Sequence, residues 1–399
     1  MVKSVVSIVK NSDPYEAVAA SLQLLGGTES LLRNCRKVLI KPNLSFPIPP
    51  QDGPDTTDPQ VVGAAVRAFK ECGAKKVIVG DQSVWGVRTR DTCKIIGLKE
   101  IVEKEGGELC YFDEEPRVLV DVPNGKFFDT FDLPKIIKEV DMIVNLPKMK
   151  TSFISHVTLG IKNHVGYLTF QDRQKFHRMY DLAYVVVDIA RVVRPNLTLI
   201  DGIVAMEGYG PHSGTAKRMN LVIGSSDLVA VDAVGAEVMG FDALEIPTTQ
   251  IAMKQGLGKG NLSEIEVVGE PIDKVKQTFE RSYIRCVSPY PNVDVYIGGM
   301  CPGCAPRIPT VPPNPDPNKK YAVVVGRRAK LPKNLNVDEI WCIGNCGIDS
   351  TMSSTNLFPR ISKEQIKFIP GCPPLKWYGS QTILKLLKEK GWAKNFSAR

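Results

Sequence analysis

The sequence predicts an α/β protein: a doubly wound, mostly parallel sheet, and after it a second, smaller α/β domain that carries cysteines. Apolar runs of strand length alternate with helix-length amphipathic segments up to about residue 275, which is typical of a parallel sheet covered by helices. The 399 residues are 43% hydrophobic, enough for more than one core. Beyond residue 280 the pattern changes to short apolar runs that end in glycine and continue to cysteine. We therefore expect domains at 1–280 and 281–399.

The elements are predicted in chain order. Residues 4–9, 37–41 and 76–80 are short apolar runs that predict strands, and the segments 14–25 and 59–72 between them predict helices. Further strands are expected at 141–145, 197–201, 221–224 and 265–268, with helices at 181–193 and 227–239. The proline-dense stretch 306–319 predicts an irregular loop, and residues 381–390 predict a closing helix.

Charge and composition exclude several classes of protein. The net charge is +8, but the basic residues are spread along the chain and no nucleic-acid motif accompanies them, so nucleic-acid binding is not expected. No apolar stretch has the length of a signal peptide or a membrane span, so we expect a cytoplasmic protein that does not bind membranes. Its ten cysteines should then be thiols rather than disulfides. Assembly into a homo-oligomer is left open.

Several predicted strands of the first domain end in polar residues. Because the carboxyl ends of parallel strands share one edge of a sheet, these side chains should line one crevice, where such folds bind ligands. The alternative for each is a role in a turn or a helix cap. The candidate substrate-binding residues at these strand ends are Lys41, Asn43, Asp81, Asn145 and Asp201.

A basic segment follows the strand at 141–145. Its lysines could hold a carboxylate or phosphate, although a solvated surface is the alternative. Lys148 and Lys162 are candidate catalytic residues, and Lys150, Asn163 and Arg173 are candidate substrate-binding residues. His177 is the third candidate catalytic residue, since a histidine beside cations should have a lowered pKa and suits a general base. The glycine-rich loop at 201–214 fits neither a dinucleotide nor a Walker spacing.

The cysteines beyond residue 280 predict a metal centre. Cys301 and Cys304 form a C-x-x-C turn, and Cys346 and Cys372 each lie just past a glycine-ended strand, so loops at one sheet edge could bring four thiolates together. Four thiolates bind a [4Fe-4S] cluster or zinc, and the cluster is favoured because structural zinc usually uses two short cysteine pairs. Cys342 lies within its predicted strand and should point into a core.

The chain resembles the DUF362 family over about residues 35–260. The resemblance is carried by Lys41-Pro42-Asn43, Thr57-Asp58-Pro59, the segment 145–150, Lys162-Asn163, Asp201-Gly202, the segment 208–211 and the segment 227–233. Members are often associated with iron-sulfur centres, commonly through an appended ferredoxin module, and their reactions are mostly unknown. This chain has dispersed cysteines in place of the closely spaced ferredoxin run.

Three functional hypotheses follow. The first is an iron-sulfur oxidoreductase, supplied by an electron-donor protein, that passes electrons to an anionic small molecule held in the lysine-rich crevice. The second is a non-redox isomerase, epimerase or lyase that uses lysine and histidine acid-base chemistry beside a structural cluster. The strand-to-loop layout is similar to that of nickel-dependent lactate racemases, without their histidine-rich metal set. The third is a carrier of electrons or of a cluster.

Overall fold

A computed structural model of the chain contains two compact units, which we describe separately. The large unit comprises residues 1–176 and 180–283, and the small unit comprises 177–179 and 284–399. The structure describes residues 3–28, 36–84, 87–152, 154–179, 182–212, 214–282, 288, 290–298, 304, 308, 311–326, 328–332, 335–354 and 362–369, except the side chains of 174, 177–179, 354 and 363.

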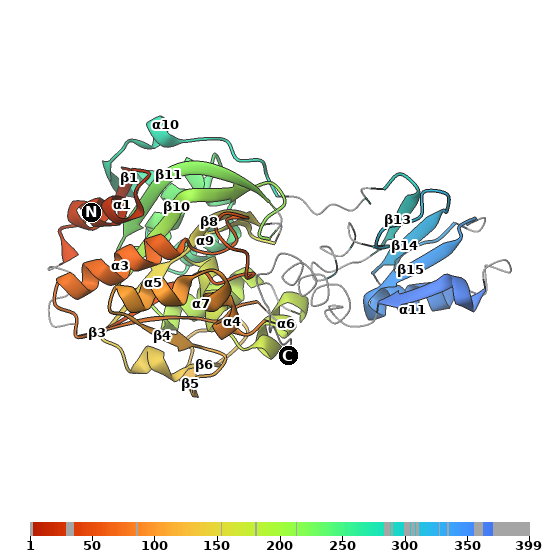
Figure 1. Cartoon of the computed structure of the whole chain (residues 1–399), viewed down its shortest axis with the longest axis horizontal. Coiled ribbons are helices and arrows are strands. Elements are labelled where there is room, and N and C mark those ends of the chain that lie inside the picture. The colour runs from red at the N-terminus through yellow and green to blue at the C-terminus, as the bar shows by residue number, and fades with distance from the viewer. Residues whose placement is uncertain are drawn as a thin grey trace. The chain divides into compact units, whose positions relative to one another are not determined.

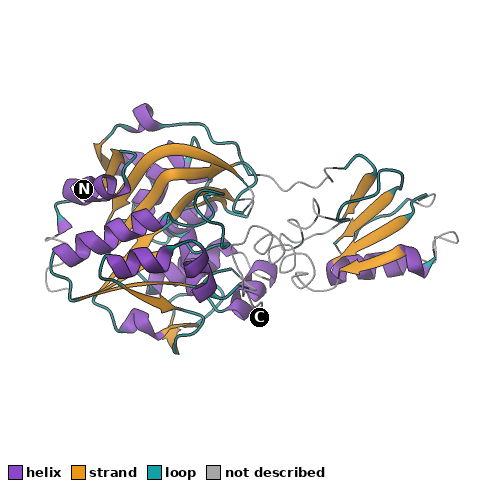
Figure 2. Ribbon diagram, viewed as in Figure 1, coloured by secondary structure: helices purple, strands orange, loops and turns teal. Residues whose placement is uncertain are grey.

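The large unit is built on a ten-stranded sheet whose main path is β12-β1-β11-β10-β7-β2-β3-β4 (Figure 2). The pairs from β10 to β4 are parallel, whereas β11 is antiparallel to both β1 and β10. β8 and β9 extend the sheet beside β10, and β5 and β6 form a separate hairpin. The strands are β1 (Ser4–Lys10), β2 (Lys37–Pro42), β3 (Lys76–Asp81), β4 (Glu108–Tyr111), β5 (Arg117–Asp121), β6 (Thr130–Pro134), β7 (Met142–Leu146), β8 (Lys148–Ser152), β9 (His156–Thr158), β10 (Leu197–Glu207), β11 (Thr215–Ser225) and β12 (Ile265–Gly269).

Helices cover both faces of this sheet. Within β2, Val38 and Ile40 join the core beneath α1, α3 and α5, whereas Leu39 joins the core beneath α7. Figure 1 shows α1, α3 and α5 in sequence across one face. Burial on both faces explains why these strands are continuous apolar runs. The helices are α1 (Pro14–Leu24), α3 (Pro59–Glu71), α4 (Thr89–Ile95), α5 (Leu98–Lys104), α6 (Phe170–Met179), α7 (Leu182–Val192), α8 (Leu228–Val238), α9 (Pro247–Lys254) and α10 (Ile272–Val275), with short 3-10 turns η1 (Lys135–Lys138), η2 (Lys162–Tyr167), η3 (Ala243–Glu245) and η4 (Leu262–Glu264).

Local sequence signals fix where the helices begin. The Asp58 carboxylate accepts a hydrogen bond from Gln60 N at 2.9 Å, and Pro59 occupies the first turn of α3. Asp227 caps α8 in the same way, accepting from Val229 N at 2.9 Å. These caps agree with the predicted starts of both helices.

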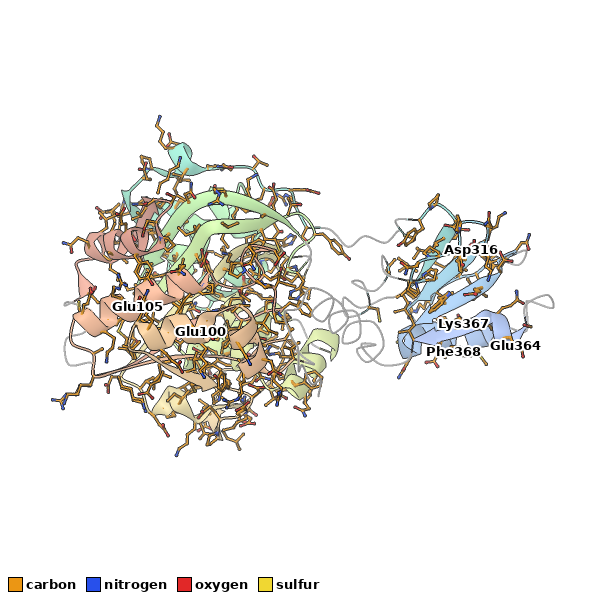
Figure 3. All side chains as sticks on the ribbon, in the orientation of Figure 1. Glu100, Glu105, Asp316, Glu364, Lys367 and Phe368 are labelled. Carbon is orange, nitrogen blue, oxygen red and sulfur yellow. The ribbon has the colours of Figure 1, made fainter. Side chains whose placement is uncertain are left out.

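The small unit contains a parallel sheet of order β13-β14-β15-β16, with α11 following β15. Its elements are β13 (Val293–Ile297), β14 (Tyr321–Val325), β15 (Glu339–Ile343), α11 (Gly344–Ser354), η7 (Lys363–Gln365) and β16 (Ile366–Ile369). Lys367 and Phe368, labelled in Figure 3, are exposed on the edge strand β16. The predicted fold class, a mostly parallel α/β sheet with a second, smaller one, is confirmed. The helix predicted at 381–390 lies outside the described residues.

Candidate functional site

The carboxyl ends of β10, β7, β2 and β3 form one edge of the large sheet. From β2 the chain moves outward to β3 and β4, and it later returns to β7 and β10 on the other side of β2. The order of the strands therefore reverses between β2 and β7. In open α/β sheets this switch point is where ligands bind.

Three asparagines fill the switch point. Asn163 Nδ2 donates to Asn145 Oδ1 at 2.8 Å, and Asn43 Nδ2 donates to Asn163 Oδ1 at 3.0 Å. Asn145 Nδ2 donates in turn to the carbonyl of Gly160 at 3.0 Å. The structure thus brings together Asn43, Asn145 and Asn163, three of the residues predicted from the sequence. Their amides brace the ends of β2 and β7 against the segment that carries Lys162.

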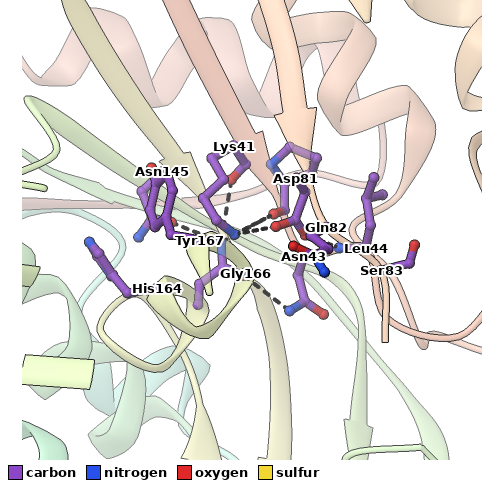
Figure 4. Close-up of polar contacts among 12 residues, drawn as sticks. Lys41, Asn43, Leu44, Asp81, Gln82, Ser83, Asn145, His164, Gly166 and Tyr167 are labelled. Atoms are coloured by element: carbon purple, nitrogen blue, oxygen red, sulfur yellow. Dashed lines mark hydrogen bonds and ion pairs between the residues drawn. The ribbon is translucent and has the colours of Figure 1, made fainter. Parts of the chain in front are cut away.

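Lys41 and Asp81 form a buried ion pair beside the asparagines (Figure 4). Lys41 Nζ lies 2.7 Å from Asp81 Oδ1, the two side chains are 0% and 2% exposed, and Asp81 Oδ2 accepts from Leu44 N at 2.7 Å. Burial lowers the pKa of Lys41, and the charge of Asp81 opposes this shift. A methyl group on Gly166 would overlap both Asp81 Oδ1 and Lys41 Nζ, so only glycine fits against this pair.

A second buried ion pair joins β8 to β10. Lys148 Nζ lies 2.8 Å from Asp201 Oδ2, because the register of the two strands places these residues side by side. Asp201 also accepts from the main-chain nitrogens of Asp58, at 2.8 Å, and Ile203, at 3.0 Å. The charge of Lys148 is therefore compensated within the protein. The segment 148–152, predicted to be a basic segment beside the crevice with a solvated surface as the alternative, is strand β8, buried throughout.

Lys150 and Asp55 form the next part of the edge. Lys150 Nζ donates to the main-chain carbonyl of Asp55 at 2.8 Å, and both side chains are buried. Burial lowers the pKa of Lys150 to about 8, with the Asp55 carboxylate acting in the opposite direction. Burial also raises the pKa of Asp55 to about 7, opposed by the charges of Lys150 and Lys148.

Arg173 is buried and tied to main-chain carbonyls. Its guanidinium donates to Ser83 O and Gln82 O, both at 2.8 Å, to Gly166 O at 3.0 Å and to Leu168 O at 3.2 Å. Burial lowers its pKa to about 10. Arg173 thus fastens the loop after β3 to the start of α6, and it places a cation behind the switch point.

Lys162 differs from the other lysines of this edge. It is half-buried, and among the residues that the structure describes no hydrogen bond or ion pair reaches its Nζ. Burial, together with the charges of Arg173 and Lys150, lowers its pKa to about 7, and no acidic group opposes this shift. Its segment is held by Asp232, which accepts from Gly160 N at 2.6 Å and Ile161 N at 2.9 Å. The fold therefore holds an ammonium group next to two other cations.

His177, the remaining catalytic candidate, belongs to α6, but its side chain lies outside what the structure describes. Sequence reasoning missed Asp55 and His212. Asp55 stands in the polar segment directly before the α3 cap, and His212 stands in the glycine-rich loop at 201–214. The sequence signal that could have identified both residues is a polar side chain in a segment that adjoins a strand end.

The small unit places two of the four predicted cluster ligands. Cys304 is buried against one face of the sheet, and Cys346 is half-buried in the first turn of α11, at the carboxyl end of β15. Cys301 and Cys372 lie outside the described residues. Cys342 lies in the core, as expected, where its thiol donates to Thr351 Oγ1 at 3.1 Å and burial raises its pKa to about 11.

These observations define an α/β protein whose mostly parallel sheet carries buried charged groups at its carboxyl edge. Residues 38–237 match the family described as a domain of unknown function (DUF362), and this match spans half of the chain. The chain belongs to the DUF362 family.

Comparisons with known proteins give three further likenesses. A thylakoid-associated protein of Synechocystis sp. is 29% identical over 275 residues, which are 64% of this chain and 81% of that protein. The lactate racemase apoprotein of Thermoanaerobacterium thermosaccharolyticum has a TM-score of 0.43 at 12% identity, and the match covers 60% of this chain and 57% of that one. A crystal structure of a Thermotoga maritima protein has a TM-score of 0.39 at 9% identity, covering 91% and 89%. At these scores the structural likenesses support no inference about chemistry.

Two other features are absent from the described part of the chain. No helix there combines the length and the apolar character needed to cross a membrane. No group of three or more His, Cys, Asp or Glu side chains gathers there as a metal site, and two of the four predicted cysteine ligands belong to this described part.

Proposed function

We propose that the large unit binds a small anionic molecule at the carboxyl edge of its sheet, with Lys162 as the cation that meets the anion. The observation that carries this proposal is the difference between Lys162 and its neighbours. Lys41 and Lys148 have aspartate partners and Lys150 donates to a carbonyl, whereas no described group compensates Lys162. A half-buried ammonium beside two cations is a position where an anion relieves an unfavourable charge.

The same residue can exchange a proton with the ligand. A lysine whose pKa is about 7 is present in both protonation states near neutral pH, which is the condition for effective general acid-base catalysis. A bound anion favours the ammonium form, so Lys162 would take up a proton as the ligand binds. This coupling links ligand binding at the switch point to proton transfer.

We further propose that the small unit holds a 4Fe-4S cluster through Cys301, Cys304, Cys346 and Cys372. Support comes from the parallel sheet, because β13, β15 and β16 end at the same edge of it and the predicted ligands follow these three strands in the sequence. Cys346 in the first turn of α11 is also placed where the helix dipole favours a thiolate. When bound, such a cluster supplies single electrons, which favours an oxidoreductase; zinc is the alternative occupant.

A second candidate function is proton transfer without redox chemistry, as in an isomerase, epimerase or lyase. The lowered pKa of Lys162 favours it, because a lysine with a pKa of about 7 can both give and take a proton near neutral pH. The two functions differ in one measurable respect. If a small molecule that co-purifies with the protein is identified by mass spectrometry, proton transfer alone would introduce deuterium from D2O without changing its oxidation state.

Isothermal titration with phosphate, malonate and citrate tests the anion site. Lys162→Met should weaken binding of the tightest of these anions by about 10- to 150-fold, the value of one charge-assisted contact. Lys104→Met, which changes an exposed lysine on α5, is the matched control and should leave affinity unchanged. Equal affinities in the two variants would remove Lys162 from the site.

Metal analysis of anaerobically purified protein tests the cluster. Iron and acid-labile sulfide should be found at roughly four each per chain, with a brown colour. Cys346→Ala and Cys372→Ala should lose both, whereas Cys72→Ala, which changes a half-buried cysteine next to α3, should retain them. A colourless, zinc-loaded preparation would contradict the cluster.

A further inference from the structure

His212 lies in the connection between β10 and β11 and is held by side chains from the loop that follows β2. Its Nδ1 is 2.9 Å from Ser45 Oγ and 3.7 Å from Asp55 Oδ1. The Phe46 ring contacts the imidazole edge-on, with 4.3 Å between the ring centroids. Two segments about 160 residues apart in the chain therefore meet at one imidazole nitrogen.

The loop that carries Ser45 and Asp55 is fixed to the strand ends. Thr57 Oγ1 accepts from Asn43 N at 2.8 Å and donates to Leu146 O at 2.7 Å. At the far end of the loop, Asp58 N donates to Asp201. Ser45 and Asp55 are thereby held at the same edge of the sheet as the asparagines and lysines.

Asp55 carries an unusual oxygen. The residue is 3% exposed, yet within the described part of the chain its Oδ1 accepts no hydrogen bond. An unsatisfied buried carboxylate oxygen destabilises the folded protein. The group that it faces at 3.7 Å is His212 Nδ1. The other charged groups acting on Asp55 are Lys150 and Lys148, and both favour its carboxylate form.

We propose that Asp55 is a positioning residue that keeps the proton of neutral His212 on Nδ1, which leaves Nε2 as a base of the anion site. Neutral imidazole has one N–H donor and one acceptor nitrogen, and the oxygens of Asp55 and Ser45 both lie at Nδ1. A carboxylate behind a histidine fixes its tautomer in this way in hydrolytic triads. This inference rests on the proposed anion site.

The proton balance of the step is simple. The electron pair on Nε2 takes a proton from the bound ligand, the ring becomes imidazolium, and the Asp55 carboxylate balances the new charge; return of the proton restores neutral His212. The His212 side chain is 31% exposed, so part of it is in contact with solvent. The ligand class that fits is a small anion with a hydroxyl or an activated C–H beside its charged group. The charged group would contact Lys162, and the hydroxyl or C–H would give its proton to His212.

The test is the tautomer of His212 in the full-length protein. Long-range 1H–15N correlation spectra of 15N-histidine-labelled protein at pH 8, without ligand, distinguish the two neutral tautomers, and His212→Gln assigns the signal. We expect wild-type His212 to carry its proton on Nδ1, and Asp55→Asn to shift it toward the Nε2–H form that free imidazole prefers. His164, whose ring nitrogens face the carbonyls of Gly160, Ile161 and Val193, should not change and is the internal control.

A wild-type His212 in the Nε2–H form would overturn the proposal, and so would an unchanged tautomer in Asp55→Asn. If Asp55→Asn does not fold, the wild-type spectrum still decides. Because the experiment contains no anion, a result that refutes the role of Asp55 would leave the proposed anion site untouched. Lys162→Met should weaken anion binding and leave the His212 tautomer unchanged.

Discussion

Replacing Lys162 by methionine should stabilise the protein at pH 6 and lose this advantage at high pH. Methionine keeps the length of the side chain and removes its charge. In the folded protein the pKa of Lys162 falls from 10.5 to about 7 through burial and two neighbouring cations. That difference corresponds to roughly 2–5 kcal/mol of destabilisation when the ammonium is charged, the lower figure allowing for solvent at this half-buried side chain.

The sign follows from proton linkage. Below pH 7 the lysine is charged in both the folded and the unfolded chain, so the folded state bears the full cost. Between pH 7 and 10.5 the folded protein has released the proton and the unfolded chain has not, so wild-type stability rises with pH by up to about 1.4 kcal/mol per pH unit. The stabilisation of Lys162→Met over wild type should therefore be largest at pH 6 and disappear near pH 10.5.

Urea unfolding at pH 6, 8 and 10 measures this effect. Because a chain of two units need not unfold in one step, the probe should report on the large unit alone. Cys93, buried in its core at 1% exposure, becomes accessible to a pulse of thiol reagent at fixed pH only when this unit opens. A variant that is less stable than wild type at pH 6, or a difference that does not change with pH, would refute the reasoning.

Three further substitutions test the same geometry. Gly166→Ala should lower the free energy of unfolding by about 3–5 kcal/mol, because the added methyl group breaks the buried Lys41–Asp81 pair. Its control is Gly73→Ala, at a position in open space with a φ of +96°, which should lower it by only about 1–2 kcal/mol in the same urea assay. Lys148→Met should destabilise by about 3–5 kcal/mol, unlike Lys162→Met, since it leaves Asp201 buried without its ion pair; equal stability of the two variants would contradict the distinction drawn between these lysines. Asp232→Asn should lower the free energy of unfolding by about 1–3 kcal/mol and accelerate hydrogen exchange of the Gly160 and Ile161 amides, because the asparagine amide keeps only one of the two accepting oxygens. Unchanged exchange at these amides would show that Asp232 does not hold this segment.

The sequence predicted the parallel layers well, because strands buried on both faces are continuous apolar runs that need no partner to be recognised. It did not reveal β8, since Lys148 and Lys150 look solvated until their partners are known. Nor did it reveal that β11 is antiparallel, because the apolar pattern of a strand carries no information about its direction. β14, although wholly buried, follows a proline-dense stretch and was overlooked.

The same limit applies to the candidate site. Strand-end logic placed Asn43 and Asn145 at one edge, because their positions depend only on where strands stop, whereas Asn163 was predicted from the basic segment and lies in η2. Which lysine is compensated depends on pairs distant in the sequence, such as Lys148 and Asp201, which are 53 residues apart. The sequence therefore indicated a charged edge, and the structure was needed to single out Lys162.

The protonation of Lys162 tests the central claim most directly. Competitive acetylation from pH 5 to 11, read by mass spectrometry at the peptide that contains Lys162 and normalised to exposed Lys104, gives the midpoint of its titration. The account predicts a midpoint near 7 in the absence of ligand, moving upward when a bound anion supplies the missing charge. A midpoint near 10.5, the ordinary lysine value, with no response to phosphate, malonate or citrate, would contradict it.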